Sequence, residues 1–184
     1  SAASDVYKRQ EIIDSIRTAI CGIASYDAKN EEIILNHKPR ITSEDRIIKG
    51  DQIKLNYSDE VLERIFIPKN AFITNASVGY NQLNIDSTNT LISFEDRMSS
   101  KVLNGFFVNG SLDSLRLIGM ASTTYHLFED SLYKGKNLTS GDTIIMRFDE
   151  KDLDDIVVDG GSQGEYVPNK KTNDSDFPLS LIHI

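Results

Sequence analysis

The residues that could do metal or redox chemistry are few and scattered along the chain. The three histidines, His37, His126 and His183, lack the close spacing of metal ligands, and Cys21 is the single cysteine. A protein zinc site usually takes three or four ligands from residues of these types. We therefore expect no metal and no other cofactor. One cysteine also excludes an internal disulfide and says little about the cellular compartment.

Two further stretches have the amino-acid composition of a calcium-binding or phosphate-binding loop, but they lack the residue spacing of such loops. The acidic run at residues 149–159 lacks the alternating ligands and closing bidentate glutamate of a calcium loop, so a solvated hairpin explains it better. The glycines at 160, 161 and 164 do not lead from a strand into a helix, so a turn is favoured over a phosphate cradle. Because no Ser/His/Asp or Cys/His set is present either, we expect no catalytic residues and no enzyme.

The strongest pattern in the chain is a repeat. Residues 141–158, GDTIIMRFDEKDLDDIVV, align without a gap with residues 50–67, GDQIKLNYSDEVLERIFI. A degraded third copy lies between them, with Lys101 in place of the aspartate and Gly105 in place of Leu55. A partial fourth unit surrounds the polar turn at residues 27–30, with Tyr26, Ile33 and Leu35. Repeated units of this size indicate stacked supersecondary structures.

Each unit has the pattern of short strands. Residues 52–57 alternate polar and apolar side chains, which is typical of a strand with one buried and one solvated face. The polar stretches at 58–61 and 149–152 are predicted hairpin connections. Because β-branched residues dominate and no helical stripe persists, we predict an all-β fold. Its expected form is an elongated antiparallel sheet, built of stacked strand repeats and folded over on itself around an apolar interior.

The apolar positions of the repeats form one inward row. For any single residue of that row, plain sheet core is the better interpretation. If the folded sheet stays slightly open, the whole row lines a long groove suited to acyl chains. The candidate lipid-binding residues are Ile53, Leu55, Tyr57, Leu103, Phe107, Ile144, Met146 and Phe148. The first and last strands would be exposed, and further modules could add there edge to edge.

Composition limits the partners. The chain has 184 residues, which allows one domain, and its hydrophobic content of 39% fits half-buried strands. A net charge of −8 argues against nucleic acid and against an anionic membrane surface, because both attract an excess of Lys and Arg. No stretch approaches the roughly 20 apolar residues of a transmembrane helix.

The two ends of the chain differ from its middle. Residues 1–10, SAASDVYKRQ, and residues 179–184, LSLIHI, resemble translated sequencing-adapter read-through, so we exclude both from the fold prediction. We expect the natural protein to extend beyond both ends, which makes a missing signal peptide uninformative. Residues 11–21 fit a short helix or a truncated strand equally well, and residues 22–168 form the repeat domain. Residues 169–178 are predicted to be a polar linker or a truncated loop, and the Asn-rich residues 77–93 are predicted to be irregular and rich in turns.

The repeat resembles a known family. Gly-Asp-x-Ile-x-Leu-x-Tyr followed by a turn and Leu-x-x-Ile-x-Ile is similar to the OstA-like family of the lipopolysaccharide-transport system. So are the phrase LDSLRLIGMASTTY at 112–125 and the Gly-Lys-Asn at 135–137 that leads into Gly141 and Asp142. The resemblance covers roughly residues 22–168. Gly105 and residues 77–93 depart from the pattern and could interrupt the groove.

The resemblance implies a periplasmic β-jellyroll module. Such modules stack end to end between the two membranes, pair with one another by edge-strand addition, and shield the lipid A acyl chains of lipopolysaccharide. The family has no catalytic residues, and its lipid contacts correspond to the inward row named above. One alternative is a structural or adhesive β-repeat protein with a closed interior and no ligand. A β-helix enzyme acting on polysaccharide ranks last, because the acidic residues are scattered by the repeat.

Overall fold

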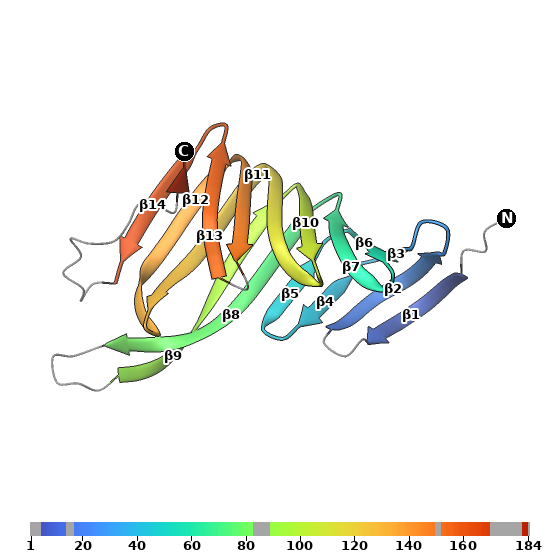
Figure 1. The fold of residues 1–184 in the computed structure, drawn as a ribbon, viewed down its shortest axis with the longest axis horizontal. Helices are drawn as coiled ribbons and strands as arrows, with labels where there is room; N and C mark the ends of the chain where they lie inside the picture. The colour runs from blue at the N-terminus through green and yellow to red at the C-terminus, as the bar shows by residue number, and fades with distance from the viewer. Residues whose placement is uncertain (1–4, 14–16, 83–88, 150–151, 170–181, 184) are drawn as a thin grey trace.

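The computed structural model describes residues 5–13, 17–82, 89–149, 152–169 and 182–183, and within these ranges every regular element is a strand. Fifteen strands form one sheet, as the all-β prediction required. The strands are β1 (Asp5–Ile13), β2 (Arg17–Asp27), β3 (Glu32–Asn36), β4 (Arg40–Ser43), β5 (Arg46–Lys49), β6 (Gln52–Ser58), β7 (Val61–Ile67), β8 (Ala71–Gln82), β9 (Asn89–Ser100), β10 (Val102–Val108), β11 (Ser111–Glu129), β12 (Leu132–Asp149), β13 (Asp152–Asp159), β14 (Gln163–Pro168) and β15 (Ile182–His183). Figure 1 shows the N-terminal strands at one end of the long axis and the C-terminal strands towards the other.

The sheet is folded over because three strands bend and change neighbours along their length. β11 pairs with β10 through residues 111–118 and with β9 through residues 122–124, and its pairing with β12 shifts register between Ile118 and Ala121. β2 likewise pairs with β4 through its first half and with β3 through its second. We call the two resulting layers the first half-sheet (β3, β6, β7, β10, β13 and the adjoining halves of β2, β11 and β12) and the second half-sheet (β4, β5, β8, β9, β14 and the other halves).

The Gly-Asp of the repeat marks the corner where the chain crosses between the half-sheets. The backbone N–H of Asp51 donates to the carbonyl of Lys69 (3.1 Å), and that of Asp142 donates to Gly160 (2.7 Å). The degraded unit and the partial fourth unit have equivalent bonds, from Lys101 to Gly119 (2.9 Å) and from Gly22 to His37 (3.2 Å). All four predicted units therefore correspond to one recurring structure, a corner followed by a hairpin.

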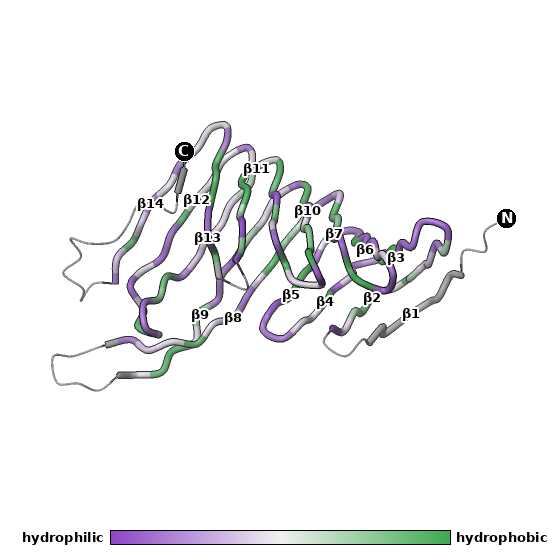
Figure 2. Tube along the Cα trace, viewed as in Figure 1, coloured by the Kyte–Doolittle hydropathy of each residue, from purple (hydrophilic) through white to green (hydrophobic). Residues whose placement is uncertain are grey.

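Both half-sheets contribute to one apolar core. Figure 2 shows apolar residues recurring along the strands between polar ones, and the inward ones form a single buried cluster. Ile67, Leu117 and Ile144 from the first half-sheet are fully buried, and Ile73 and Met98 from the second are nearly so. Burial of apolar surface contributes about 25 cal/mol per Å² to folding, so this shared interior holds the two layers together.

The structure corrects two predictions. The helix considered for residues 11–20 is wrong: the described residues belong to β1 and β2, which pair with each other. The irregular segment at 77–93 is also wrong for its described part, because β8 and β9 pair in unbroken register from Ala71 with Ser100 to Gln82 with Asn89. Backbone pairing along the whole hairpin outweighs the turn preference of its asparagines. Residues 83–88 lie outside the described part.

The structure describes part of the two chain ends that were excluded from the fold prediction. Residues 5–10 belong to β1, and Ile182 and His183 pair with Ile156 and Val157 of β13. Of the predicted linker at 169–178, Asn169 alone is described. Its backbone N–H donates to the carbonyl of Lys134, and its side chain donates to Asn81.

Candidate ligand-binding cleft

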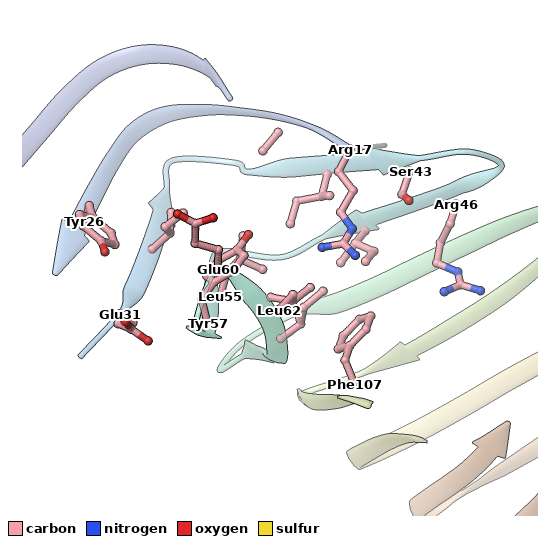
Figure 3. Close-up of a pocket in the computed structure, with 15 residues that line it drawn as sticks. Arg17, Tyr26, Glu31, Ser43, Arg46, Leu55, Tyr57, Glu60, Leu62 and Phe107 are labelled. Carbon is pink, nitrogen blue, oxygen red and sulfur yellow. The ribbon is translucent and has the colours of Figure 1, made fainter. Parts of the chain in front are cut away.

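A cleft of 410 Å³ opens between the half-sheets in the N-terminal half of the molecule. Residues of the β2–β3 and β6–β7 hairpin turns, Glu31 and Glu60, lie at its edge, which places it on the side away from the corners. Its floor is aliphatic and comes from both half-sheets (Figure 3). The aliphatic lining residues are Ala19, Ile33, Ile41, Ile48, Leu55, Leu62 and Ile65.

Strand length explains why the cleft lies here. β4 and β5 have four residues each, whereas β6 and β7 opposite them have seven. The short strands leave the inner side of the β6–β7 hairpin partly uncovered, and Tyr57 there is only partly buried. Further along the molecule, β11 and β12 have 19 and 18 residues and take part in both half-sheets.

Two arginines stand at one end of the cleft. Arg17 of β2 and Arg46 of β5 both line it, and Figure 3 shows them on the same side, with Phe107 of β10 below. The Arg17 guanidinium carbon lies 5.8 Å from the Phe107 ring centroid, within the range of a cation–π contact. Among the described residues, none forms a hydrogen bond or ion pair with the Arg46 guanidinium.

Burial lowers the pKa of the Arg46 guanidinium from its ordinary value, and the negative charge of Glu44 acts in the opposite direction. Arginine keeps its proton in proteins, so the side chain remains a cation that has lost part of its hydration. An anion placed against it would replace the lost water contacts.

A second cavity of 500 Å³ continues the cleft past the arginines. It shares Arg17, Ser43, Arg46 and Phe107 with the first cavity. The rest of its lining is mostly polar and includes Glu44, Asp45, Asn75, Ser77 and Ser111. Its further apolar side chains are Ala76, Leu112 and Phe148. The cleft is thus apolar at one end and polar at the other, with two cations at the junction.

The structure places the eight predicted lipid-binding residues in different surroundings. Leu55, Tyr57 and Phe107 line the apolar cavity, and Phe148 lines the polar one. The other four line neither cavity and are at most 1% exposed: Ile53, Leu103, Ile144 and Met146. Gly105 leaves no gap, because a Cβ there would lie 3.0 Å from the Leu115 Cδ2. Four residues of the row therefore border a cavity, and the other four are packed in the core.

Arg17 and Arg46 were not predicted. A signal for them exists in the alternation, since Arg46 and Ile48, like Arg17 and Ala19, are two residues apart and so share one face of a strand. A cation at an inward position of an otherwise apolar row marks a site where charge meets apolar surface.

The fold and the cleft define an elongated β-jellyroll with a lateral apolar cavity and a cationic junction. No family model matches the chain, and no curated protein matches it by sequence. Among solved structures it is similar to LptH, described as the LptA-homologous periplasmic component of the conserved lipopolysaccharide transport device from Pseudomonas aeruginosa. The identity is 11%, the match covers 83% of this chain and 80% of that chain, and the TM-score is 0.45. The two structures are similar only in the general outline of the fold.

The described residues show neither a metal site nor a membrane-spanning helix. They contain no cluster of three or more His, Cys, Asp or Glu side chains able to hold a metal ion. They also contain no helix with the length and hydropathy needed to cross a bilayer.

Proposed function

We propose that this protein is a periplasmic, lipid-shielding module of lipopolysaccharide transport to the outer membrane, a binding module rather than an enzyme. The observation that carries the proposal is the aliphatic cleft between the half-sheets with two arginines at its end. The resemblance of the Gly-Asp repeat to the OstA-like family supports it. The ligand would be lipid A, whose acyl chains occupy the apolar cavity.

The chemistry of the cleft suits such a ligand. Removing one methylene group from water contributes about 0.8 kcal/mol, so an acyl chain of ordinary length binds well to an aliphatic floor. Guanidinium groups form bidentate hydrogen bonds with phosphate, and lipid A carries phosphates next to its chains. Arg17 and Arg46 stand where such groups would emerge from the apolar cavity.

The partners would be other β-jellyroll modules that add to the ends of the sheet. At the N-terminal end, β1 pairs with both halves of β2 and so forms the edge of both half-sheets. At the C-terminal end, β14 and β13 both pair with β12, and beyond β13 lies only the two-residue β15. Exposed strand edges offer backbone groups for pairing with a further strand. Stacked in this way, the modules would continue the shielded path.

Photo-crosslinking tests the proposal directly. A photoreactive residue placed at Tyr57 or Phe107, which line the apolar cavity, should capture lipopolysaccharide in cells that make it. The same residue at Arg116, which is exposed on β11, should not. Absence of adducts at both cleft positions, while an established lipopolysaccharide carrier treated in parallel gives adducts, would rule the proposal out.

The second candidate is a structural or adhesive β-repeat protein. The closed packing of Leu103, Ile144 and Met146, each at most 1% exposed, favours it, because that part of the interior has no room for a ligand. This candidate predicts no lipid adduct at any position. It also predicts that a substitution that fills the cleft leaves the structural or adhesive role of the protein unchanged.

A further inference from the structure

The volume of the apolar cavity limits how much ligand it holds. A cavity of about 150 Å³ lined by Leu, Ile and Phe accepts one benzene molecule, which corresponds to about 25 Å³ per carbon. By that scale, the 410 Å³ of the apolar cavity takes about sixteen carbons. The cavity therefore fits one acyl chain, and the several chains of a lipid A molecule exceed it.

The charges along the cleft fix the direction of that chain. Glu31 and Glu60 stand at the end formed by the β2–β3 and β6–β7 hairpins, where Figure 3 shows them apart from the arginines. Arg17 and Arg46 stand at the other end, where the polar cavity begins. The carboxylates at both ends belong to exposed residues, so the two arginines decide the direction: they attract an anionic head group, and the chain would lie on the aliphatic floor with its head at the junction.

Arg46 is the side chain best placed to bind that head group. Its guanidinium is partly buried and, among the described residues, has neither a hydrogen bond nor an ion pair. The nearby carboxylates of Glu44 and Asp45 belong to exposed residues of the β4–β5 turn, where water screens them. An anion at the junction would therefore compete with solvated carboxylates and with the Tyr125 side chain for a poorly solvated cation.

We infer that the cleft binds one acyl chain that carries an anionic head group, with the chain in the apolar cavity and the head between Arg17 and Arg46. The inference rests on the proposed lipid-binding function and narrows its ligand. The predicted ligand is an amphiphile with one acyl chain and an anionic head group. It is either a free molecule or one chain of a larger lipid.

Binding of simple amphiphiles tests this inference. Dodecyl phosphate and dodecyl maltoside have the same chain and differ in head-group charge, and inorganic phosphate has the charge without the chain. In isothermal titration below the critical micelle concentrations, we expect one dodecyl phosphate per protein. We also expect at least about tenfold weaker binding of the maltoside, about 1.4 kcal/mol, and no detectable binding of inorganic phosphate.

Substitution at the junction supplies the matched comparison. Arg46→Gln should abolish the preference for dodecyl phosphate, whereas Arg116→Gln, on the exposed side of β11, should leave it intact. If Arg46→Gln does not fold, the preference of the unaltered protein is measured against salt, because an ionic contribution falls as ionic strength rises.

The possible results distinguish a failure of the inferred single-chain anionic ligand from a failure of the proposed lipid-binding function. Equal affinity for the two dodecyl compounds would overturn the anionic head group and leave an apolar lipid cleft standing. Two or more chains per protein, or equal losses in both arginine variants, would also overturn the inference. Inorganic phosphate binding as tightly as dodecyl phosphate would indicate a plain anion site and overturn it too. No binding of either amphiphile, together with no crosslinked lipopolysaccharide, would remove the proposed function itself.

Discussion

At the scale of single residues, the repeated Gly-Asp is explained by close packing at the corners. A Cβ on Gly141 would lie 2.6 Å from the Val158 Cγ1 and 3.1 Å from the Gly160 carbonyl oxygen. A Cβ on Gly50 would meet the Ile67 Cγ2, at the same point of its own corner. Glycine is needed there because the facing β-branched side chain occupies the space of a Cβ. The corner of the degraded unit differs, since Ser100 stands at the position of Gly50 and Gly141.

We predict that Gly141→Ala lowers the free energy of unfolding by about 1–3 kcal/mol, the usual cost of overpacking a filled site. The control is Gly161→Asn in the same corner. A Cβ at Gly161 meets no atom within 4 Å, and asparagine tolerates its φ of 56°. Urea denaturation of both variants measures the difference.

The double variant Gly141→Ala/Val158→Ala tests the cause of that loss. If the Val158 methyl group is the obstacle, the double variant should be less destabilised than the sum of the two single variants, by about 1 kcal/mol. If the stability losses of the two single variants simply add up in the double variant, contact with the Val158 methyl group is not the reason that position 141 needs glycine.

At the scale of elements, the β8–β9 hairpin is held by a buried polar pair where backbone pairing stops. β9 pairs with β11 through Arg97, Met98 and Ser99 alone. Beyond them, Asp96, which is 3% exposed, accepts a hydrogen bond from the His126 backbone N–H (2.7 Å) and lies 2.8 Å from the His126 Nδ1. Phe94, Phe128 and Tyr133 pack around this pair, with Phe94 and Tyr133 stacked at 4.4 Å.

We predict that Asp96→Ala destabilises the protein by about 2–3 kcal/mol, because it leaves the partly buried His126 N–H groups without their acceptor. Asp96→Asn keeps an acceptor oxygen and should cost about 1 kcal/mol. Asp154→Ala, at an exposed position of β13, should change stability by less than about 0.5 kcal/mol. Chemical denaturation measures all three, and a loss in Asp96→Ala no larger than in Asp154→Ala would contradict the assigned role.

The hairpin also shows what the sequence could and could not predict. Strands β6, β7, β12 and β13 follow from local alternation, and their corners follow from the Gly-Asp repeat. The length of β8 and β9 does not, because it depends on contacts such as Asp96 with His126, thirty positions apart. The inward direction of Leu55 and Met146 was likewise predictable, but the space in front of each was not. That space depends on the facing strand, which is short opposite Leu55.

At the scale of the whole molecule, one apolar interior includes residues that line the cleft and residues that are closely packed. Ala19 and Ala121 are both buried alanines of the second half-sheet, 6% and 1% exposed. Ala19 lines the apolar cavity, whereas Ala121 lines neither cavity and belongs to the closed core. The same enlargement should therefore have opposite effects at the two positions.

We predict that Ala19→Leu stabilises the protein by about 0.5–2 kcal/mol, as cavity-filling substitutions commonly do, and weakens the binding of dodecyl phosphate. Ala121→Leu should instead cost about 1–3 kcal/mol, because its added methyl groups have no space. Thermal unfolding gives the sign of each change, and titration of the Ala19→Leu variant gives the loss of binding. If both variants lose stability equally, the interior is closed throughout, and the structural β-repeat protein becomes the better account. A stabilised Ala19→Leu that no longer binds lipid would show that the empty space is kept for a ligand at the expense of stability.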